Sequence, residues 1–284
     1  MRTILFIWEL GSGLGHLLPF QQVCHYLDSD EYKIYIASRN IPLAKEVFEK
    51  PNINFIEAPF ENINTNQPLN ATCYTDLLIS DGFNNNQILM ERVIKWNEIY
   101  SLVKPDIIIF DHSPSALLSA LSFSFKKIII GSGFLCPPSG NPFGDFFEHF
   151  PNLNQNPDIT FRQNYILNNC NDVLQKISQP PIKYISDLYS QANETFITSF
   201  KEFDHFPSRE EGNFIGVRHC DSGIIPSWPD TTGMRVFIYL KPFAQLAPLI
   251  ELLAQSDLSI IFYTGSFNPK FRKDSNHETT QSFK

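Results

Sequence analysis

A short apolar segment near the start of the chain leads into a glycine-rich turn and then into a helix-like pattern. Residues 4–8 are apolar, residues 9–16 read ELGSGLGH, and an amphipathic pattern runs from Leu17 to about Leu27. A buried strand that feeds a glycine turn and a helix start makes an anion-binding pocket, because free backbone N–H groups and the helix dipole point at one spot. This arrangement predicts a βαβ fold with a ligand site at the turn, and His16 adds a group that can do chemistry there.

The same alternation of short apolar runs and longer helical patterns continues over residues 1–217. Because parallel strands must be joined by long crossover connections, this alternation is typical of parallel βαβ units. The sequence therefore predicts an α/β fold, with a Rossmann-like amino-terminal domain built on a parallel sheet. The predicted strands are 4–8, 33–37, 54–56, 107–110, 127–130, 195–198 and 213–217, and the predicted helices are 17–27, 43–49, 87–102, 114–121, 160–177 and 185–192.

The carboxyl-terminal part of the chain reads as the start of a second domain. Residues 218–233 contain glycines and prolines without helical or strand periodicity, which is typical of a linker. A strand at 235–239, a helix at 244–255 and a strand at 258–263 predict a second Rossmann-like unit over 234–265, and 266–284 is a polar tail. Since a domain usually needs on the order of 100 residues, we expect this second domain to be incomplete, that is, truncated.

Composition excludes several classes of protein. The 284 residues are 43% hydrophobic and 18% charged, with a net charge of -8, which indicates a globular chain without a basic surface for nucleic acid. The five cysteines are widely spaced and form no C-x-x-C pair, so neither a disulfide framework nor a metal site is predicted. No apolar run is long enough for a signal peptide or a transmembrane segment. We expect a cytoplasmic protein.

Two polar side chains are expected to meet at the carboxyl edge of the predicted sheet. His16 follows the first strand, and Asp111 closes the fourth strand at the end of residues 107–110. In a doubly wound sheet these two strands are neighbours, and ligands bind at their carboxyl ends. An aspartate on one imidazole nitrogen fixes the tautomer and leaves the other nitrogen to take a proton from a hydroxyl. The sequence therefore predicts a general-base dyad of His16 and Asp111.

Both residues of the dyad also have purely structural interpretations. A histidine at a helix start is often a surface or packing residue, and His112 is a rival to His16 as the partner of Asp111. Asp111 can also cap the following helix, although Ser113 and Pro114 already supply an N-cap and a favoured first helical residue. The dyad is therefore a hypothesis that depends on the strand order.

Two other enzyme classes are weaker alternatives. Gly11 and Gly13 match the first two glycines of the dinucleotide-binding pattern G-x-G-x-x-G, but His16 occupies the third position. The second strand ends in residues 37–39, with the sequence ASR, where a ribose-binding acid is expected. No G-x-S-x-G elbow of a serine hydrolase occurs in the glycine turns. A nicotinamide-dependent oxidoreductase therefore remains only as an alternative.

Together these segments resemble a known family. Residues 13–16 (GLGH) after the first strand, 105–111 (PDIIIFD) at the fourth and 131–134 (GSGF) after the fifth, with a linker into a second nucleotide-binding-like domain, are similar to GT-B glycosyltransferases. The similarity is to the UDP-glycosyltransferase/macrolide glycosyltransferase superfamily (family 1 type). It implies that His16 is the base that acts on the acceptor hydroxyl and that Asp111 orients it.

The resemblance also implies substrates. It implies inverting, metal-free transfer of a sugar from a UDP- or dTDP-linked nucleotide-sugar to a small apolar acceptor, with no cofactor. The acceptor would be bound by residues 1–217 and the donor by residues 234–265, although the His-Cys-Gly segment and the acidic-Gln pair that hold the donor in the family do not occur here. The residues implied to contact substrates are Gly13, Gly15, Gly133, Phe134 and Phe143.

Two alternatives accompany this interpretation. The loop over 131–151, with Phe134, Phe143, Phe146 and Phe147, either shapes an apolar acceptor pocket or packs its own phenylalanines together. For the whole chain, the alternative to a transferase is a truncated, non-catalytic small-molecule-binding protein or an inactive gene remnant.

Overall fold

The computed structural model describes residues 1–10, 14–48, 52–60, 71–140, 143–150, 152, 158–210, 212–217, 227–229, 232–240 and 243–263. The chain divides into two compact units, Met1–Arg218 and His219–Lys284, and each is described by itself. Among the segments singled out in the sequence, Gly13, most of 218–233 and all of 266–284 lie outside the described residues.

The first unit is built on a seven-stranded sheet with the order β3-β2-β1-β4-β5-β6-β7, and each pair of neighbours is parallel. The α/β class and the parallel sheet predicted from the sequence are confirmed. The winding direction reverses between β1 and β4, which is the switch point expected from the sequence. The strands are β1 (Arg2–Trp8), β2 (Tyr32–Ser38), β3 (Ile53–Glu57), β4 (Ile107–Asp111), β5 (Lys126–Gly131), β6 (Glu194–Ile197) and β7 (Asn213–Phe214).

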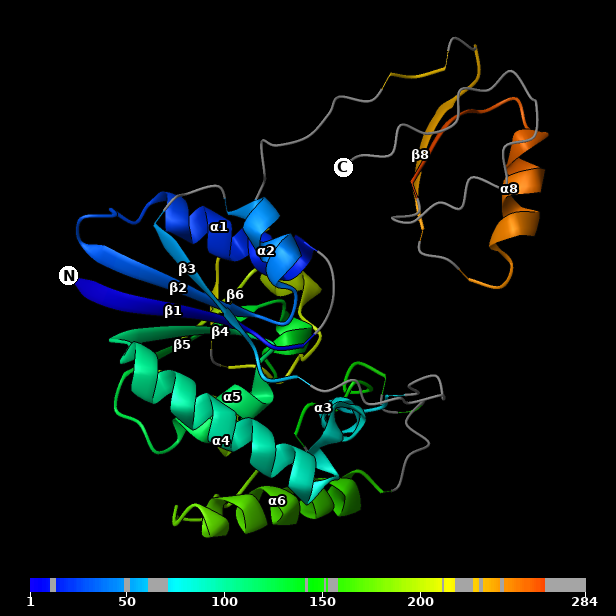
Figure 1. The fold of residues 1–284 in the computed structure, drawn as a ribbon. Helices are drawn as coiled ribbons and strands as arrows, with labels where there is room; N and C mark the ends of the chain where they lie inside the picture. Colours follow the sequence, from blue (N-terminus) through cyan, green and yellow to red (C-terminus); the bar gives the residue numbers. More distant parts are fainter. Residues whose placement is uncertain are drawn as a thin grey trace. The chain divides into compact units, whose positions relative to one another are not determined.

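Helices cover both faces of this sheet (Figure 1). One face carries α1 (Leu17–His25) and α2 (Ile41–Val47), and the other carries α4 (Asn86–Val103) and α5 (Pro114–Ala120), with α6 (Ile159–Lys176) packed against α4 on the side away from the sheet. Alternate residues of β1 pack on opposite faces of the sheet, because successive side chains of a strand point in opposite directions. Ile4 and Phe6 belong to the core under α1, whereas Leu5 and Ile7 belong to the core under α4. A strand buried on both faces in this way reads as the continuous apolar run seen in the sequence.

Asparagine side chains start two of these helices. Asn40 accepts the Leu43 N–H at 3.1 Å before α2, and Asn85 accepts the Gln87 and Ile88 N–H groups at 3.0 and 3.2 Å before α4. Such caps satisfy backbone donors that have no partner inside the helix.

The segment between β3 and α4 differs from the sequence prediction. It contains a short helix, α3 (Tyr74–Leu78), followed by a π-helical turn, η2 (Ile79–Phe83), where no helix was predicted. The Asp76 carboxylate accepts the Thr72 and Cys73 N–H groups at 2.7 and 3.2 Å, and it pairs with Arg162 of α6 at 2.8 Å. A helix this short shows no periodicity in the sequence, because tertiary contacts and not propensity stabilise it. Another difference is α7 (Asp187–Ser190), which is shorter than predicted.

The second unit contains one βαβ crossover. β8 (Arg235–Tyr239) and β9 (Ser259–Tyr263) are parallel neighbours, and α8 (Leu246–Ala254) connects them. These elements agree with the strands and helix predicted over 235–263. No residue of α8 is buried, in contrast to the helices of the first unit.

Candidate active site

The ends of β1 and β4 bring the two predicted site residues together. The strands pair in register from Ile4 with Ile107 to Trp8 with Asp111. After β1 the chain reaches a 3-10 turn, η1 (Leu14–His16), and His16 occupies the N-cap position of α1. Its Nδ1 lies 3.1 Å from Oδ1 of Asp111, which is a hydrogen-bond distance between residues 95 positions apart.

The two groups of this pair differ in exposure. Asp111 is 2% exposed, whereas the His16 side chain is 15% exposed. Burial raises the pKa of Asp111, and the hydrogen bond and charge of His16 act in the opposite direction. When Nδ1 carries the proton and donates to Asp111, Nε2 is left as the proton acceptor. The geometry is therefore that of an oriented imidazole that can act as a general base.

Two aromatic rings lie beside the imidazole of His16. The indole of Trp8 is 5.5 Å away between ring centroids and 15° from parallel, and the ring of His112 is 6.2 Å away and 28° from parallel. The Trp8 indole N–H donates to the Leu10 carbonyl, which fixes that ring in turn. The rival His112 therefore lies near His16 with its ring tilted by 28°, while Asp111 is bonded to His16.

The turn after β4 is tied to the turn after β1 by Ser113. Its hydroxyl accepts the Glu9 N–H at 3.1 Å and lies 3.1 Å from the Ile7 carbonyl and 2.8 Å from the Asp111 carbonyl. Ser113 is the N-cap residue of α5 and Pro114 lies in its first turn, as the sequence predicted, but the Ser113 side chain makes no capping hydrogen bond to the helix. The hydroxyl is instead used between the strands.

The side-chain acceptor at the start of α5 is Glu9. Its carboxylate accepts the N–H groups of Ser115 and Ala116 at 3.1 and 3.3 Å, and also the Ser115 hydroxyl. Glu9 is fully buried, which raises its pKa, while the charge of Arg92 acts to lower it. A carboxylate at the N-terminus of a helix is stabilised by the free N–H groups and the dipole. No sequence motif marks Glu9 as a capping residue.

Glu9 belongs to a buried charge cluster, which also contains Arg39, Asp81 and Arg92. Arg39 follows β2 and lies 3.6 Å from the ring centroid of Phe60, and Arg92 donates to the Asp81 carbonyl at 2.5 Å. Arg92 is buried. Burial and the charge of Glu9 raise the pKa of Asp81 to about 7, against the effect of Arg92 and Arg39. The sequence gives a signal for only one member of this cluster, because Glu9 directly follows the apolar residues 4–8.

The glycines predicted to contact substrates have different environments. Gly13 lies outside the described residues, and Gly15 is exposed, with no atom within 4 Å of the Cβ that a side chain would add. Gly133 is packed, because an added Cβ would clash with Oδ1 of Asp204, and its carbonyl accepts a bond from Arg209 at 3.0 Å. Gly133 therefore has a clear packing role, whereas Gly15 leaves open space.

The two predicted phenylalanines also differ. Phe143 is 2% exposed and packs against Tyr74 and Tyr189 at 5.7 and 5.4 Å between ring centroids. Phe134 is partly exposed and stacks on Phe146 at 4.8 Å. Of the two, only Phe134 presents surface to a ligand in this structure, and Phe143 supports the loop from the core.

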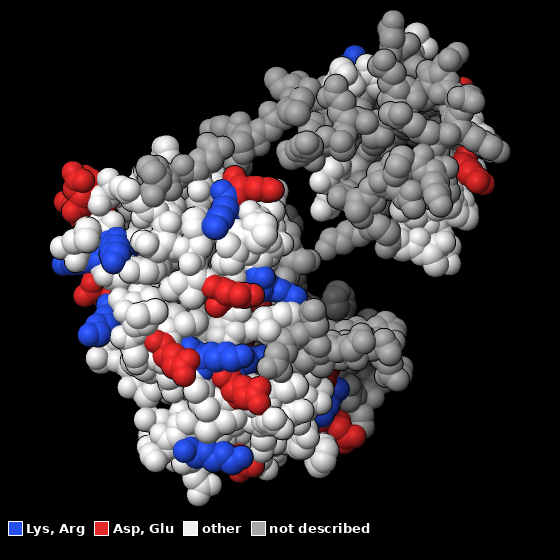
Figure 2. Space-filling model, in the orientation of Figure 1, with Lys and Arg blue, Asp and Glu red and all other residues white. Residues whose placement is uncertain are grey.

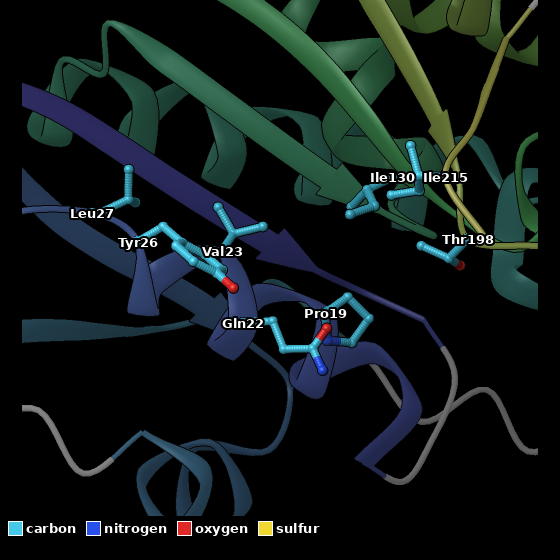
Figure 3. A pocket seen from close by; sticks show the side chains of 8 residues that line it. All are labelled: Pro19, Gln22, Val23, Tyr26, Leu27, Ile130, Thr198 and Ile215. Atoms are coloured by element: carbon cyan, nitrogen blue, oxygen red, sulfur yellow. The ribbon is translucent and has the colours of Figure 1, made fainter. Parts of the chain in front are cut away.

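A separate pocket of about 190 Å³ lies between α1 and the ends of β5 to β7 (Figure 3). Figure 3 shows side chains of α1 on one side of it and those of Ile130, Thr198 and Ile215 on the other. The dyad does not line it. Its lining is mainly apolar and consists of Pro19, Gln22, Val23, Tyr26, Leu27, Ile130, Thr198 and Ile215.

Metal-binding and membrane-spanning features are absent from the part of the chain that the structure describes. Among the described residues, no cluster of three or more histidine, cysteine or acidic side chains could hold a metal ion. None of the helices in the described segments is both long and apolar enough to span a membrane. On the face shown in Figure 2, the described acidic and basic side chains are interspersed.

The fold is that of GT-B glycosyltransferases. CalG4, the calicheamicin glycosyltransferase, superimposes with a TM-score of 0.67 at 18% identity, over 99% of this chain and 70% of CalG4. The glycosyltransferase SnogD from Streptomyces nogalater gives a TM-score of 0.57 at 11% identity, over 99% of this chain and 72% of SnogD. The spinosyn rhamnosyltransferase SpnG, complexed with thymidine diphosphate, gives 0.51 at 12% identity, over 92% of this chain and 65% of SpnG.

These similarities are in fold, since the sequence identities are low. No protein-family model matches the chain, and no curated protein sequence matches it significantly. The GT-B resemblance stated from the sequence motifs is nonetheless confirmed at the level of the fold.

Proposed function

We propose that this protein is a glycosyltransferase in which His16 takes the proton of an acceptor hydroxyl while a sugar moves from a nucleotide donor. The observation that carries this proposal is the 3.1 Å contact between Nδ1 of His16 and Oδ1 of Asp111 at the carboxyl ends of neighbouring parallel strands. The fold shared with glycosyltransferases supports the reaction class. The geometry of the dyad supports the roles of the two residues.

The reaction follows from the protonation states of the dyad. Nδ1–H of His16 donates to Asp111, and Nε2 takes the acceptor proton as the hydroxyl oxygen attacks the anomeric carbon. The bond from that carbon to the diphosphate oxygen breaks, and the nucleoside diphosphate leaves with the electron pair. Attack from the side opposite the leaving group inverts the anomeric configuration. The carboxylate of Asp111 stabilises the imidazolium that forms.

The two substrates are assigned to the two parts of the chain. We assign the acceptor to residues 1–217, where the dyad lies and where Gly15 and the Phe134 ring leave surface for it. Residues 234–265 are assigned to a UDP- or dTDP-linked donor. The SpnG complexes with thymidine diphosphate and with spinosyn aglycone support a nucleotide donor and an apolar acceptor.

A transfer assay tests this proposal. The protein is incubated with UDP-glucose or dTDP-rhamnose and a set of aromatic and polycyclic alcohols, and products are detected by mass spectrometry. We expect a product heavier by one sugar, with inverted anomeric configuration by NMR. Binding of NAD(P) but not of UDP or dTDP in calorimetric titrations would instead favour the oxidoreductase. Binding of an alcohol without any transfer would favour a non-catalytic binding protein.

A further inference from the structure

His112 has an unusual backbone conformation for its position. Its φ is +43°, a region that non-glycine residues seldom adopt. The other described non-glycine residues with positive φ are Lys104 and Ser178, and both end a helix, where this conformation is common. His112 instead precedes α5, and its carbonyl accepts the Leu10 N–H at 3.1 Å. The strain is therefore held in place by the contact between the turns after β1 and β4.

The side chain of His112 does not compensate for this strain by hydrogen bonding. Its Nε2 is buried, and no residue in the described segments lies within hydrogen-bond distance of it. Strained backbones with such uncompensated groups are concentrated at functional sites. Two other rings lie near it, that of His16 at 6.2 Å and that of Tyr74 at 6.3 Å between centroids. The strained backbone of His112 thus places its ring beside that of His16.

The bond to Asp111 alone does not fix the imidazole of His16. Rotation about the Cβ–Cγ bond of a histidine is broad and roughly two-fold, so a half turn would place a ring carbon near the carboxylate. The ring must leave its plane during this half turn, so rings that lie beside its faces hinder the passage between the two orientations. Trp8 and His112 both lie nearly parallel to His16, at 15° and 28°. Burial lowers the pKa of His112 to about 3, so its ring is neutral at pH 7 and does not repel an imidazolium beside it.

We propose that His112 is a positioning residue, whose ring holds the imidazole of His16 so that Nδ1 stays on Asp111 and Nε2 stays available to the acceptor. Its importance for catalysis rests on the proposed function, but the positioning itself does not. The residue types that fit a positive φ, glycine and asparagine, lack the ring that this position supplies. At position 112, histidine is less favourable for the backbone than glycine or asparagine. Of these three residue types, only histidine has a ring that can restrain His16.

The test is the tautomer of His16, read from its imidazole nitrogen shifts by NMR in ¹⁵N-labelled full-length protein, without any substrate. H112N and H112G remove the ring and fit the positive φ, so both variants are expected to fold. H112F keeps a ring and removes the nitrogens. In the wild type we expect a single Nδ1–H tautomer, in H112N and H112G a mixture of the two neutral tautomers, and in H112F the wild-type spectrum if it folds.

Two results would overturn the inference. One is an unchanged Nδ1–H tautomer of His16 in both H112N and H112G, which would show that the ring contact restrains nothing. The other is a wild-type spectrum in which His16 carries its proton on Nε2. Because this readout needs neither donor nor acceptor, it fails separately from the proposed function, which fails when the wild type forms no glycoside.

Discussion

Two groups of buried polar residues lie near the carboxyl ends of the strands of the same sheet. They differ in whether a polar atom remains available to a substrate. The dyad, His16 and Asp111, joins a buried carboxylate to an imidazole that keeps 15% of its side-chain surface exposed. The buried charge cluster places the Glu9 carboxylate against the N-terminus of α5; Glu9 and Arg92 are buried, and Arg39 and Asp81 are partly exposed. In the dyad, Nε2 of His16 remains available as a proton acceptor. In the cluster, the Glu9 carboxylate oxygens bond to the N–H groups of α5 and so join β1 to that helix. We therefore expect variants of the dyad to lose activity and variants of the cluster to lose stability.

The largest expected effect is that of H16A. Removal of the base should lower kcat by about 10³-fold, because general-base catalysis contributes on the order of 10²–10⁴. The free energy of unfolding should fall by about 1–2 kcal/mol, because the buried Asp111 carboxylate loses its hydrogen-bond partner. Transfer rates and urea denaturation measure the two quantities. H25A, which changes an exposed histidine of the same helix, is the matched control, and equal rates for H16A and H25A would contradict the account.

Removal of Glu9 should have the opposite profile. E9A removes one of the two acidic groups near the buried Arg92 and leaves two N–H groups of α5 without an acceptor, so the free energy of unfolding should fall by about 3 kcal/mol. Urea denaturation measures this loss. The control is E57A, at the exposed end of β3. A loss no larger than that of E57A would remove the structural role assigned to the cluster.

The variant D111N separates orientation from charge. Its amide oxygen can still accept the His16 N–H, but it cannot stabilise an imidazolium, so kcat should fall by about 10²-fold. Stability should stay the same or rise, because burial raises the pKa of Asp111 and penalises its charged form. D106N, at the exposed start of the same strand, is the control. If D111N were less stable than the wild type but had a normal kcat, the role of Asp111 would be structural and not catalytic.

The smallest expected effect concerns Asp81 and pH. Its pKa of about 7 lies above the usual 3.8, so the folded protein keeps a proton that the unfolded chain releases between about pH 4 and 7. Stability therefore falls as pH rises through this window, and D81N should remove that part of the fall. We expect D81N to be more stable than the wild type by about 1–2 kcal/mol at pH 8 and equal to it near pH 3.5. Denaturation curves at several pH values, with D158N as control, measure the difference, and identical pH profiles for D81N and the wild type would contradict it.

The sequence alone predicts the strands of the first unit and the proximity of His16 and Asp111. Runs such as 4–8 and 107–111 are buried on both faces of the sheet, so their apolar character is continuous and easily recognised. The strand order at a doubly wound switch point then places His16 near Asp111 without any contact information. The structure agrees with both inferences.

What the sequence does not predict are contacts made by single side chains over long separations. Glu9 reaches Ser115 across 106 positions, and no periodic pattern marks such a pair. The sequence places Ser113 correctly at the N-cap of α5, but it does not show that the Ser113 hydroxyl bonds to Glu9 and Ile7 instead of to the helix. The positive φ of His112 cannot be predicted from the sequence either, since it accompanies the hydrogen bond from the Leu10 N–H to the His112 carbonyl.

The central claim is that His16 and Asp111 act as one unit, and a double-mutant cycle on transfer tests it most directly. The kcat values of H16A, D111N and the double variant are compared with that of the wild type. If the carboxylate acts only through the imidazole, D111N should add no further loss once His16 is absent, and the double variant should match H16A. Losses that multiply in the double variant would show that the two residues act independently and would contradict the account.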